Sequence, residues 1–158
     1  MNNLFGALAK KVESFNKNAA KEAVKATIPA RNIMIRMNKD QLLVYGIDSE
    51  GRPTRNSRGS TQYRPRTIRQ KKIEGQTYSH ITLNDSGAFY DSFDINFKPT
   101  TIRFEAYDIK KNDQGGLDSL FAIHGKNVMG LTKENLEIIK KDYTQPNMVL
   151  ALRNKIKR

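Results

Sequence analysis

The segment of residues 81–97 constrains the fold of this chain most, because the spacing of its apolar residues changes twice. Ile81–Leu83 has the pattern of an extended strand, Ala88–Phe93 has apolar residues at helical spacing, and Phe93–Phe97 alternates as a strand does. Gly87 lies in the turn between the first two parts, where the missing side chain lets the backbone bend without a clash. We therefore expect a packing corner that joins a long basic segment before it to a small sheet after it.

Four residues of this corner receive a structural role. Phe89 and Phe93 are four positions apart, so both would lie on one face of a single helical turn. Asp85 or Ser86 is placed to cap that turn by accepting hydrogen bonds from its free backbone N–H groups. The pattern thus assigns the corner to Asp85, Gly87, Phe89 and Phe93, and it favours a structural corner over a reactive site.

Alternation after the corner predicts a β-hairpin. Apolar residues alternate in Phe93–Phe97 and again in Ile102–Ala106, with a turn at Lys98–Thr100 between them. After a second turn at Asn112–Gly116, Leu120–His124 can supply a third antiparallel strand. Three strands with one apolar face need a covering layer. The predicted fold class is α+β, a small antiparallel sheet of three to four strands covered by the N-terminal helix.

Residues 3–26 have the pattern of an amphipathic helix. Its apolar stripe consists of Leu4, Leu8, Val12, Phe15, Ala19 and Ala23. A narrow stripe of this kind suits packing against another helix or a neighbouring subunit, while the lysines of the helix leave contact with a membrane surface as a second interpretation. Pro29 is expected to end the helix.

The C-terminal segment is also predicted to be helical. Thr132 is placed as an N-cap, and Leu131 and Leu136 around it have the spacing of a hydrophobic staple. Pro146 is expected to interrupt this helix. A last amphipathic turn or two then ends in basic residues, where positive charge is favourable.

The chain of 158 residues, 37% of them hydrophobic, is expected to form a single domain with a modest core. Its parts are the N-terminal helix at 1–28, a long basic loop arm at 52–78, a sheet core at 79–124 and a C-terminal helical segment at 131–158. The absence of cysteine excludes disulfides, thiol catalysis and cysteine-ligated zinc. No apolar run approaches the roughly 20 residues that span a bilayer, and the N-terminus is too polar for a secretory signal, so we expect a soluble protein made in the cytosol.

Positive charge is concentrated in one interval of the sequence. The formal net charge is +12, and no acidic residue lies between Glu50 and Glu74. The basic residues of this interval are Arg52, Arg55, Arg58, Arg64, Arg66, Arg69, Lys71 and Lys72. A long structureless loop is uncommon in a compact domain, so we expect the arm to have a function or to fold on contact with a partner. A solvated loop, a protein interface and a nucleic-acid interface stay open, and Tyr63 and Tyr78 beside the run fit stacking on bases.

Groups for catalysis are sparse in the sequence. His80 and His124 do not have the spacing of a metal site with acidic neighbours. Asp85, Asp91 and Asp94 could be paired carboxylates of a cell-wall hydrolase, but aspartates beside glycine and serine are also what caps and turns require. The sequence contains no phosphate-binding loop pattern and singles out no Ser-His-Asp set. We therefore expect no enzymatic activity, no catalytic residues, no metal and no cofactor.

Three stretches resemble motifs of one protein family. They are residues 41–51 (QLLVYGIDSEG), residues 83–93 (LNDSGAFYDSF) and residues 129–136 (MGLTKENL). The first is similar to a QLxxGxDxxG segment, the second to an LxDTGxLxxS corner with Ser86 at the threonine position, and the third to an FLGLSxExL helix start. Their order and spacing resemble the tail-completion and head-to-tail joining proteins of tailed bacteriophages, a virion morphogenesis family.

This resemblance implies an α+β subunit without enzymatic activity that assembles as a ring at the neck or upper tail of a virion. Its partners would be portal, connector or tail proteins, and it would be synthesised in the host cytoplasm and act without a membrane. We expect the basic run to dock against an acidic surface of a neighbour, with the Phe89–Phe93 corner as its fixed base. The alternative is a basic nucleic-acid-binding module that makes non-specific contact with DNA.

Overall fold

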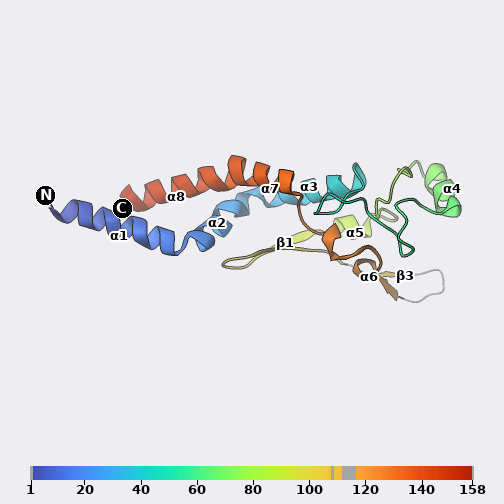
Figure 1. Ribbon diagram of the computed structural model, residues 1–158, viewed down its shortest axis with the longest axis horizontal. Coiled ribbons are helices and arrows are strands. Elements are labelled where there is room, and N and C mark those ends of the chain that lie inside the picture. Colours follow the sequence, from blue (N-terminus) through green and yellow to red (C-terminus); the bar gives the residue numbers. More distant parts are fainter. Residues whose placement is uncertain (1, 108, 112–116, 158) are drawn as a thin grey trace.

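The computed structural model describes residues 2–107, 109–111 and 117–157. The helices are α1 (Asn2–Lys17), α2 (Ala19–Thr27), α3 (Arg31–Leu43), α4 (Pro65–Ile73), α5 (Ala88–Asp91), α6 (Leu120–His124), α7 (Lys133–Ile139) and α8 (Gln145–Lys157). The strands are β1 (Asp94–Phe97), β2 (Ile102–Glu105), β3 (Ile109–Lys111) and β4 (Leu117–Ser119). The molecule is elongated, with α1 and α8 antiparallel at the end that holds both termini and α4 at the opposite end (Figure 1).

The sheet predicted from the sequence is wrong. The described residues are mostly helical, and their strands form two separate two-stranded sheets, β1 with β2 and β3 with β4. The predicted hairpin is present as β1 and β2, with Ile95 opposite Phe104 in an antiparallel register. The turn predicted at Asn112–Gly116 lies outside the described residues.

Leu120–His124, predicted as a third strand, is helix α6. The hydroxyl oxygen of Ser119 accepts a hydrogen bond from the backbone N–H of Ala122 at 3.1 Å and so caps the first turn of this helix. A short apolar run has no period long enough to separate strand from helix, and here the capping serine before it decides for the helix.

The layer that covers the hairpin also differs from the prediction. Ile95 of β1 packs into a cluster with Ala30 and Met34 at the start of α3 and with Leu131 and Ile139. The cover is therefore α3 rather than residues 3–26.

Helices α1 and α2 instead pack along the C-terminal helix. The Nζ of Lys11 lies 3.4 Å from the carbonyl oxygen of Ile156, and the side-chain amide of Asn147 donates to the carbonyl of Ala26 at 2.9 Å. The hydroxyls of Thr27 and Thr144 are 2.8 Å apart. The narrow stripe of α1 thus finds a helix as its partner, one of the two kinds of partner that the sequence suggested.

Of the two prolines predicted to break helices, Pro29 does so and Pro146 does not. Pro29 ends α2, but it does so inside a 3-10 turn (Ile28–Ala30) from which α3 starts directly. Pro146 lies near the start of α8, directly after a π-helical turn (Lys140–Thr144), and helical backbone runs from α7 through this turn into α8. A π turn shifts the hydrogen-bond ladder, which lets a residue without an N–H follow it.

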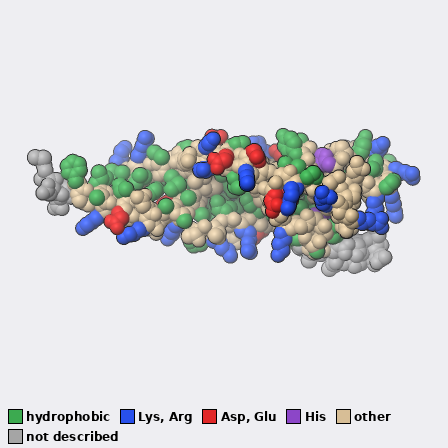
Figure 2. All heavy atoms as spheres, in the orientation of Figure 1, with side chains coloured by type: hydrophobic (Ala, Val, Ile, Leu, Met, Phe, Trp, Pro, Cys, Tyr) green, Lys and Arg blue, Asp and Glu red, His purple; other side chains and the backbone are tan. Residues whose placement is uncertain are grey.

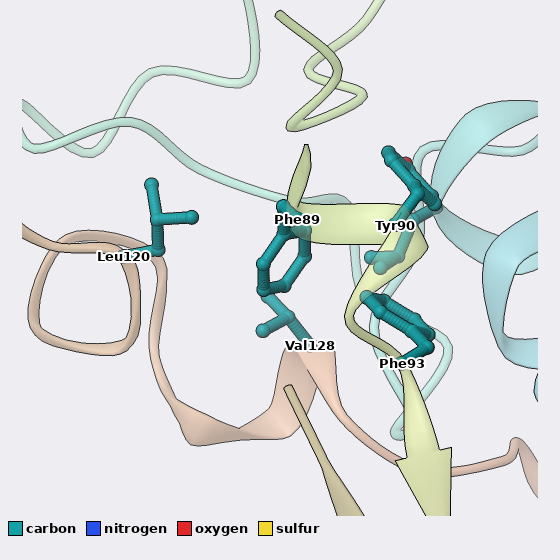
Figure 3. Packing of buried hydrophobic residues seen from close by; sticks show 6 residues of the cluster. Phe89, Tyr90, Phe93, Leu120 and Val128 are labelled. Atoms are coloured by element: carbon teal, nitrogen blue, oxygen red, sulfur yellow. The ribbon is translucent and has the colours of Figure 1, made fainter. Parts of the chain in front are cut away.

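The corner at residues 81–97 lies in the main core. Phe89, Tyr90 and Phe93 are buried together with Leu42, Leu120 and Val128. Figure 3 shows Phe89 against Val128 and Tyr90 beside Phe93. The Phe89 and Phe93 rings meet edge to face at 4.9 Å between centroids. The turn starts at Gly87, whose φ is +87°, and the Ser86 hydroxyl accepts from the N–H of Ala88 at 3.4 Å. Ile81–Leu83 is irregular rather than a strand.

Candidate functional site

The basic segment of residues 52–78 is not a loop throughout. Its second half contains α4, which begins at Pro65 and lies at one end of the molecule (Figure 1). Proline is favoured at the first position of a helix because its fixed φ is already helical and the N–H that it lacks would have no partner there. We call residues 55–78, the loop before α4 together with α4 and the turn after it, the basic end.

The loop before α4 is held by its own hydrogen bonds. The side-chain oxygen of Asn56 accepts from the N–H groups of Arg58 and Ser60 at 2.9 Å and 3.1 Å. The guanidinium of Arg55 donates to the carbonyl of Gly59 at 2.7 Å. This part of the chain therefore has a defined shape without any partner.

Besides Arg55, which is exposed, two more of the predicted interface residues make contacts within the fold. Arg52 pairs with Asp48 at 3.2 Å and with Glu50 at 2.7 Å, just before the basic end. Lys71 is only 5% exposed, and its ammonium donates to Gln76 Oε1 at 2.7 Å and to the carbonyl of Asn84. Lys71 is therefore not available to a partner in this conformation, whereas Arg52 stays exposed while it pairs with two carboxylates.

The basic end is fastened to the corner at residues 81–97. The hydroxyl of Tyr63 accepts from the N–H of Thr82 at 2.9 Å and lies 3.0 Å from its Oγ1. The ammonium of Lys71 lies 4.9 Å above the ring of Tyr63, and the amide of Gln76 donates to the carbonyl of Asp85 at 3.1 Å. These contacts thus attach the basic end to the corner, which holds it in place.

The remaining basic residues face outward. Arg58, Arg64, Arg66 and Arg69 are exposed, and none of them belongs to an ion pair within the part of the chain that the structure describes. Lys72 is exposed as well, with its ammonium 4.9 Å above the ring of Tyr78. Lys and Arg side chains gather at this end in Figure 2. Exposed guanidinium groups bind carboxylates or phosphates through paired hydrogen bonds, so this surface suits an anionic partner.

Of the aspartates considered for hydrolysis, Asp94 is used within the fold. Asp94 accepts a hydrogen bond from the N–H of Ile95 and pairs with Arg31, and both contacts hold the pKa of its carboxyl below the usual value. A general acid needs the opposite shift. Asp91 lines an open groove of about 610 Å³ between α3 and the corner, beside Arg36 and Lys39 of α3.

Both histidines make contacts that hold the backbone. The Nε2 of His80 lies 3.1 Å from the carbonyl of Leu43 at the end of α3. A Cβ added at Gly46, where φ is +63°, would lie 2.3 Å from His80 Cδ2, so this close approach requires glycine. The Nδ1 of His124 lies 2.7 Å from the carbonyl of Arg55.

Sequence reasoning missed two buried amides on α3. The side chain of Asn38 donates to the carbonyl of Val128 at 3.0 Å and accepts from the N–H of Gly130 at 3.1 Å. The side chain of Gln41 donates to the carbonyl of Gly130 and accepts from the N–H of Thr132, both at 3.0 Å. The two amides thus satisfy backbone hydrogen-bonding groups of the segment that leads into α7, as the backbone of a neighbouring strand does in a sheet. Their spacing of three along an otherwise apolar helix face is the only signal in the sequence.

Two other kinds of site are absent from the described residues. Within the described residues, no group of three or more His, Asp or Glu side chains could hold a metal ion. In the same part of the chain, no helix has both the length and the apolar character that crossing a membrane requires. No family model, curated protein or solved structure matches this chain.

Proposed function

We propose that this chain is a structural, non-enzymatic subunit of a tailed-bacteriophage virion, a neck or tail-completion protein that forms a ring and joins the portal or connector to the tail. The proposal starts from the three motifs at residues 41–51, 83–93 and 129–136 and from their order in the sequence. It places the protein in the virion after synthesis in the host cytoplasm.

One structural observation carries the proposal furthest, namely that the two ends of this elongated molecule differ in chemistry. One end presents the exposed guanidinium groups of the basic end, and the other is a pair of helices, α1 and α8, whose exposed apolar side chains lie between basic ones (Figures 1 and 2). A joining subunit must hold different neighbours with different surfaces, and ring interfaces are head-to-tail, so two unlike surfaces of one subunit must be complementary.

In this function the basic end docks on an acidic surface of a neighbouring virion protein. We would measure binding of the full chain to a purified portal or connector ring, and compare it with a variant in which Arg58, Arg64, Arg66 and Arg69 are changed to Gln. Each exposed ion pair contributes about 0.2–1 kcal/mol, so the loss of all four should weaken binding by about 0.8–4 kcal/mol, which is at least about fourfold.

A matched control removes the same charge elsewhere. Lys98, Arg103, Lys133 and Lys141 are exposed and lie outside the basic end. Changing these residues to Gln should leave binding to the ring unchanged. Equal losses in both variants would mean that net charge, and not the basic end, drives the association, and this would contradict the proposed docking.

The second candidate function is nucleic-acid binding, and the exposed arginines favour it. The ring of Tyr63 is covered by Lys71 and its hydroxyl is bonded to Thr82, which leaves this tyrosine poorly placed for stacking on bases. Contact through the exposed arginines alone predicts that the logarithm of DNA affinity falls with the logarithm of salt concentration with a slope of about −3 to −4. A slope of that size, lost in the arginine variant and combined with indifference to the portal ring, would favour this function over the virion one.

A further inference from the structure

The helical arm formed by α1 and α8 exposes more apolar surface than its two helices can cover. Its exposed apolar side chains are Phe5 (73% exposed), Leu8 (38%), Val149 (48%), Leu150 (55%) and Ile156 (38%). None of the residues of α8, all of which are described, is buried. An apolar surface of this kind on a helix pair is typical of a packing partner that is missing.

The sequence of α1 shows why the pair is incomplete. Phe5, Leu8, Val12 and Phe15 are spaced three, four and three residues apart, which is the spacing of a seam that packs between helices. Only Phe15 of these is buried, under the chain of α8, and the ammonium of Lys155 lies 5.9 Å from its ring centroid. Toward the start of α1 the seam is uncovered, with Phe5 and Leu8 both exposed.

The charged side chains of the arm indicate which kind of partner it can bind. In Figure 2 hydrophobic side chains run along the middle of the arm, and Lys and Arg side chains border them on both edges. The basic residues of α1, α2 and α8 are Lys10, Lys11, Lys17, Lys21, Lys25, Arg153, Lys155 and Lys157. The acidic residues of these helices, Glu13 and Glu22, are already paired with Lys17 and Lys25. We call the five exposed apolar side chains of α1 and α8 named above the apolar strip. Its edges are therefore strongly positive.

We propose that the α1–α8 arm binds an amphipathic, acidic helix of another protein, which lies along the apolar strip with its carboxylates against the basic edges. Helices that present an apolar face to a groove commonly bind in this way. A second copy of this chain would bring its own lysines against these edges, and like charges oppose that pairing. A membrane surface, the second interpretation suggested by the sequence of the lysine-rich helix, is the other occupant that the test below separates from a helix. This site lies at the opposite end from the basic end and does not rest on the proposed function.

The test uses the full chain and two synthetic peptides. Both peptides carry leucine at the seam positions of each seven-residue repeat, and one has Glu at the flanking positions where the other has Lys. Binding is followed by fluorescence anisotropy at low and moderate salt. We expect the Glu peptide to bind, more weakly as salt rises, and the Lys peptide not to bind.

Variants locate the peptide on the arm. Leu150→Gln should weaken binding of the Glu peptide about tenfold, because the peptide would cover a side chain that is now half exposed. Ala151→Ser on the same helix, at an exposed position that is rotated away from Val149, Leu150 and Ile156, should leave binding unchanged. Both variants should keep the wild-type unfolding midpoint, since both positions are exposed.

Other outcomes would overturn the proposal. These are equal binding of both peptides, binding of neither, binding of the Glu peptide that survives Leu150→Gln, or binding of the chain to anionic phosphatidylserine vesicles without binding to the peptide. A dimer in native mass measurements that Leu150→Gln abolishes would assign the arm to a second copy instead.

Discussion

Lys71 illustrates how a single residue of the basic interval can serve the fold rather than a partner. In the sequence it cannot be distinguished from its neighbour Lys72, since both lie in the same run without acidic residues. In the structure Lys71 is buried and bonded to Gln76 and Asn84, whereas Lys72 is exposed. The rotation of 100° between neighbouring residues of α4 makes this difference.

Replacing Lys71 by Met should destabilise the protein. The substitution keeps the length of the side chain but leaves the carbonyl of Asn84 and the side-chain oxygen of Gln76 without their donor, so we expect the free energy of unfolding to fall by about 1–3 kcal/mol. Urea unfolding measures this change. Lys72→Met is the matched control and should cost less than about 1 kcal/mol. Similar losses in both variants would contradict the role of Lys71 as the residue that holds α4 against the corner.

Tyr90 predicts how stability depends on alkaline pH. Burial, together with the nearby Tyr63, raises the pKa of its hydroxyl, which donates to the carbonyl of Thr82. In the unfolded chain a tyrosine ionises near pH 10, so the contribution of Tyr90 is fully present below that pH and is lost as the pH rises above it. The free energy of unfolding of wild type relative to Tyr90→Phe, measured by urea unfolding from about pH 8 to about pH 11, should therefore decrease above about pH 10. A difference that stays constant over this range would show that Tyr90 ionises equally in both states.

At the scale of elements, the sequence predicted features whose signal is local. The hairpin of β1 and β2 follows from strict alternation, and the N-cap at Thr132 is present, with its hydroxyl accepting from the N–H of Asn135 at 3.4 Å. Helix α3 was missed because Asn38 and Gln41 interrupt its apolar pattern, and these amides are favourable only beside the backbone of residues 128–132. That backbone is distant in the sequence, so no local window contains the reason for the helix.

The sequence predicted that the candidate site is basic, but it did not predict which of its side chains are exposed. The run of basic residues located the basic end, and Pro65 was the visible sign that a helix begins there. Which cations point outward depends on contacts with Thr82, Asn84 and Asp85, and these form only when the corner is folded. The basic run itself contains no periodic pattern from which these tertiary contacts could be predicted.

Two phenylalanines of α1 test how the arm is built. Phe15 is 6% exposed, so Phe15→Ala should lower the free energy of unfolding by about 3–5 kcal/mol. Phe5 is 73% exposed, so Phe5→Ala should change it by no more than about 0.5 kcal/mol. Thermal or urea unfolding of the two variants makes the comparison. A large loss for Phe5→Ala would mean that the start of α1 is already covered in the isolated protein.

At the scale of the whole molecule, the structure is elongated, with the basic end and the α1–α8 arm at opposite ends (Figure 1). The core between them is formed by α3, the corner and the segment before α7. Uncovered apolar side chains lie at both ends of the molecule and also beside the core, among them Val44, Tyr45, Leu136 and Ile138. Such a distribution is expected for a subunit whose stability and function come from assembly with neighbours.

The measurement that tests this central claim most directly is native mass together with negative-stain imaging of the nuclease-treated full chain, alone and mixed with a portal or connector ring, at low and moderate salt. The proposed function predicts rings of the chain alone, or complexes that form only with the portal or connector ring. A monomer that ignores the ring and binds DNA with a steep salt dependence would contradict it and assign the basic end to nucleic acid.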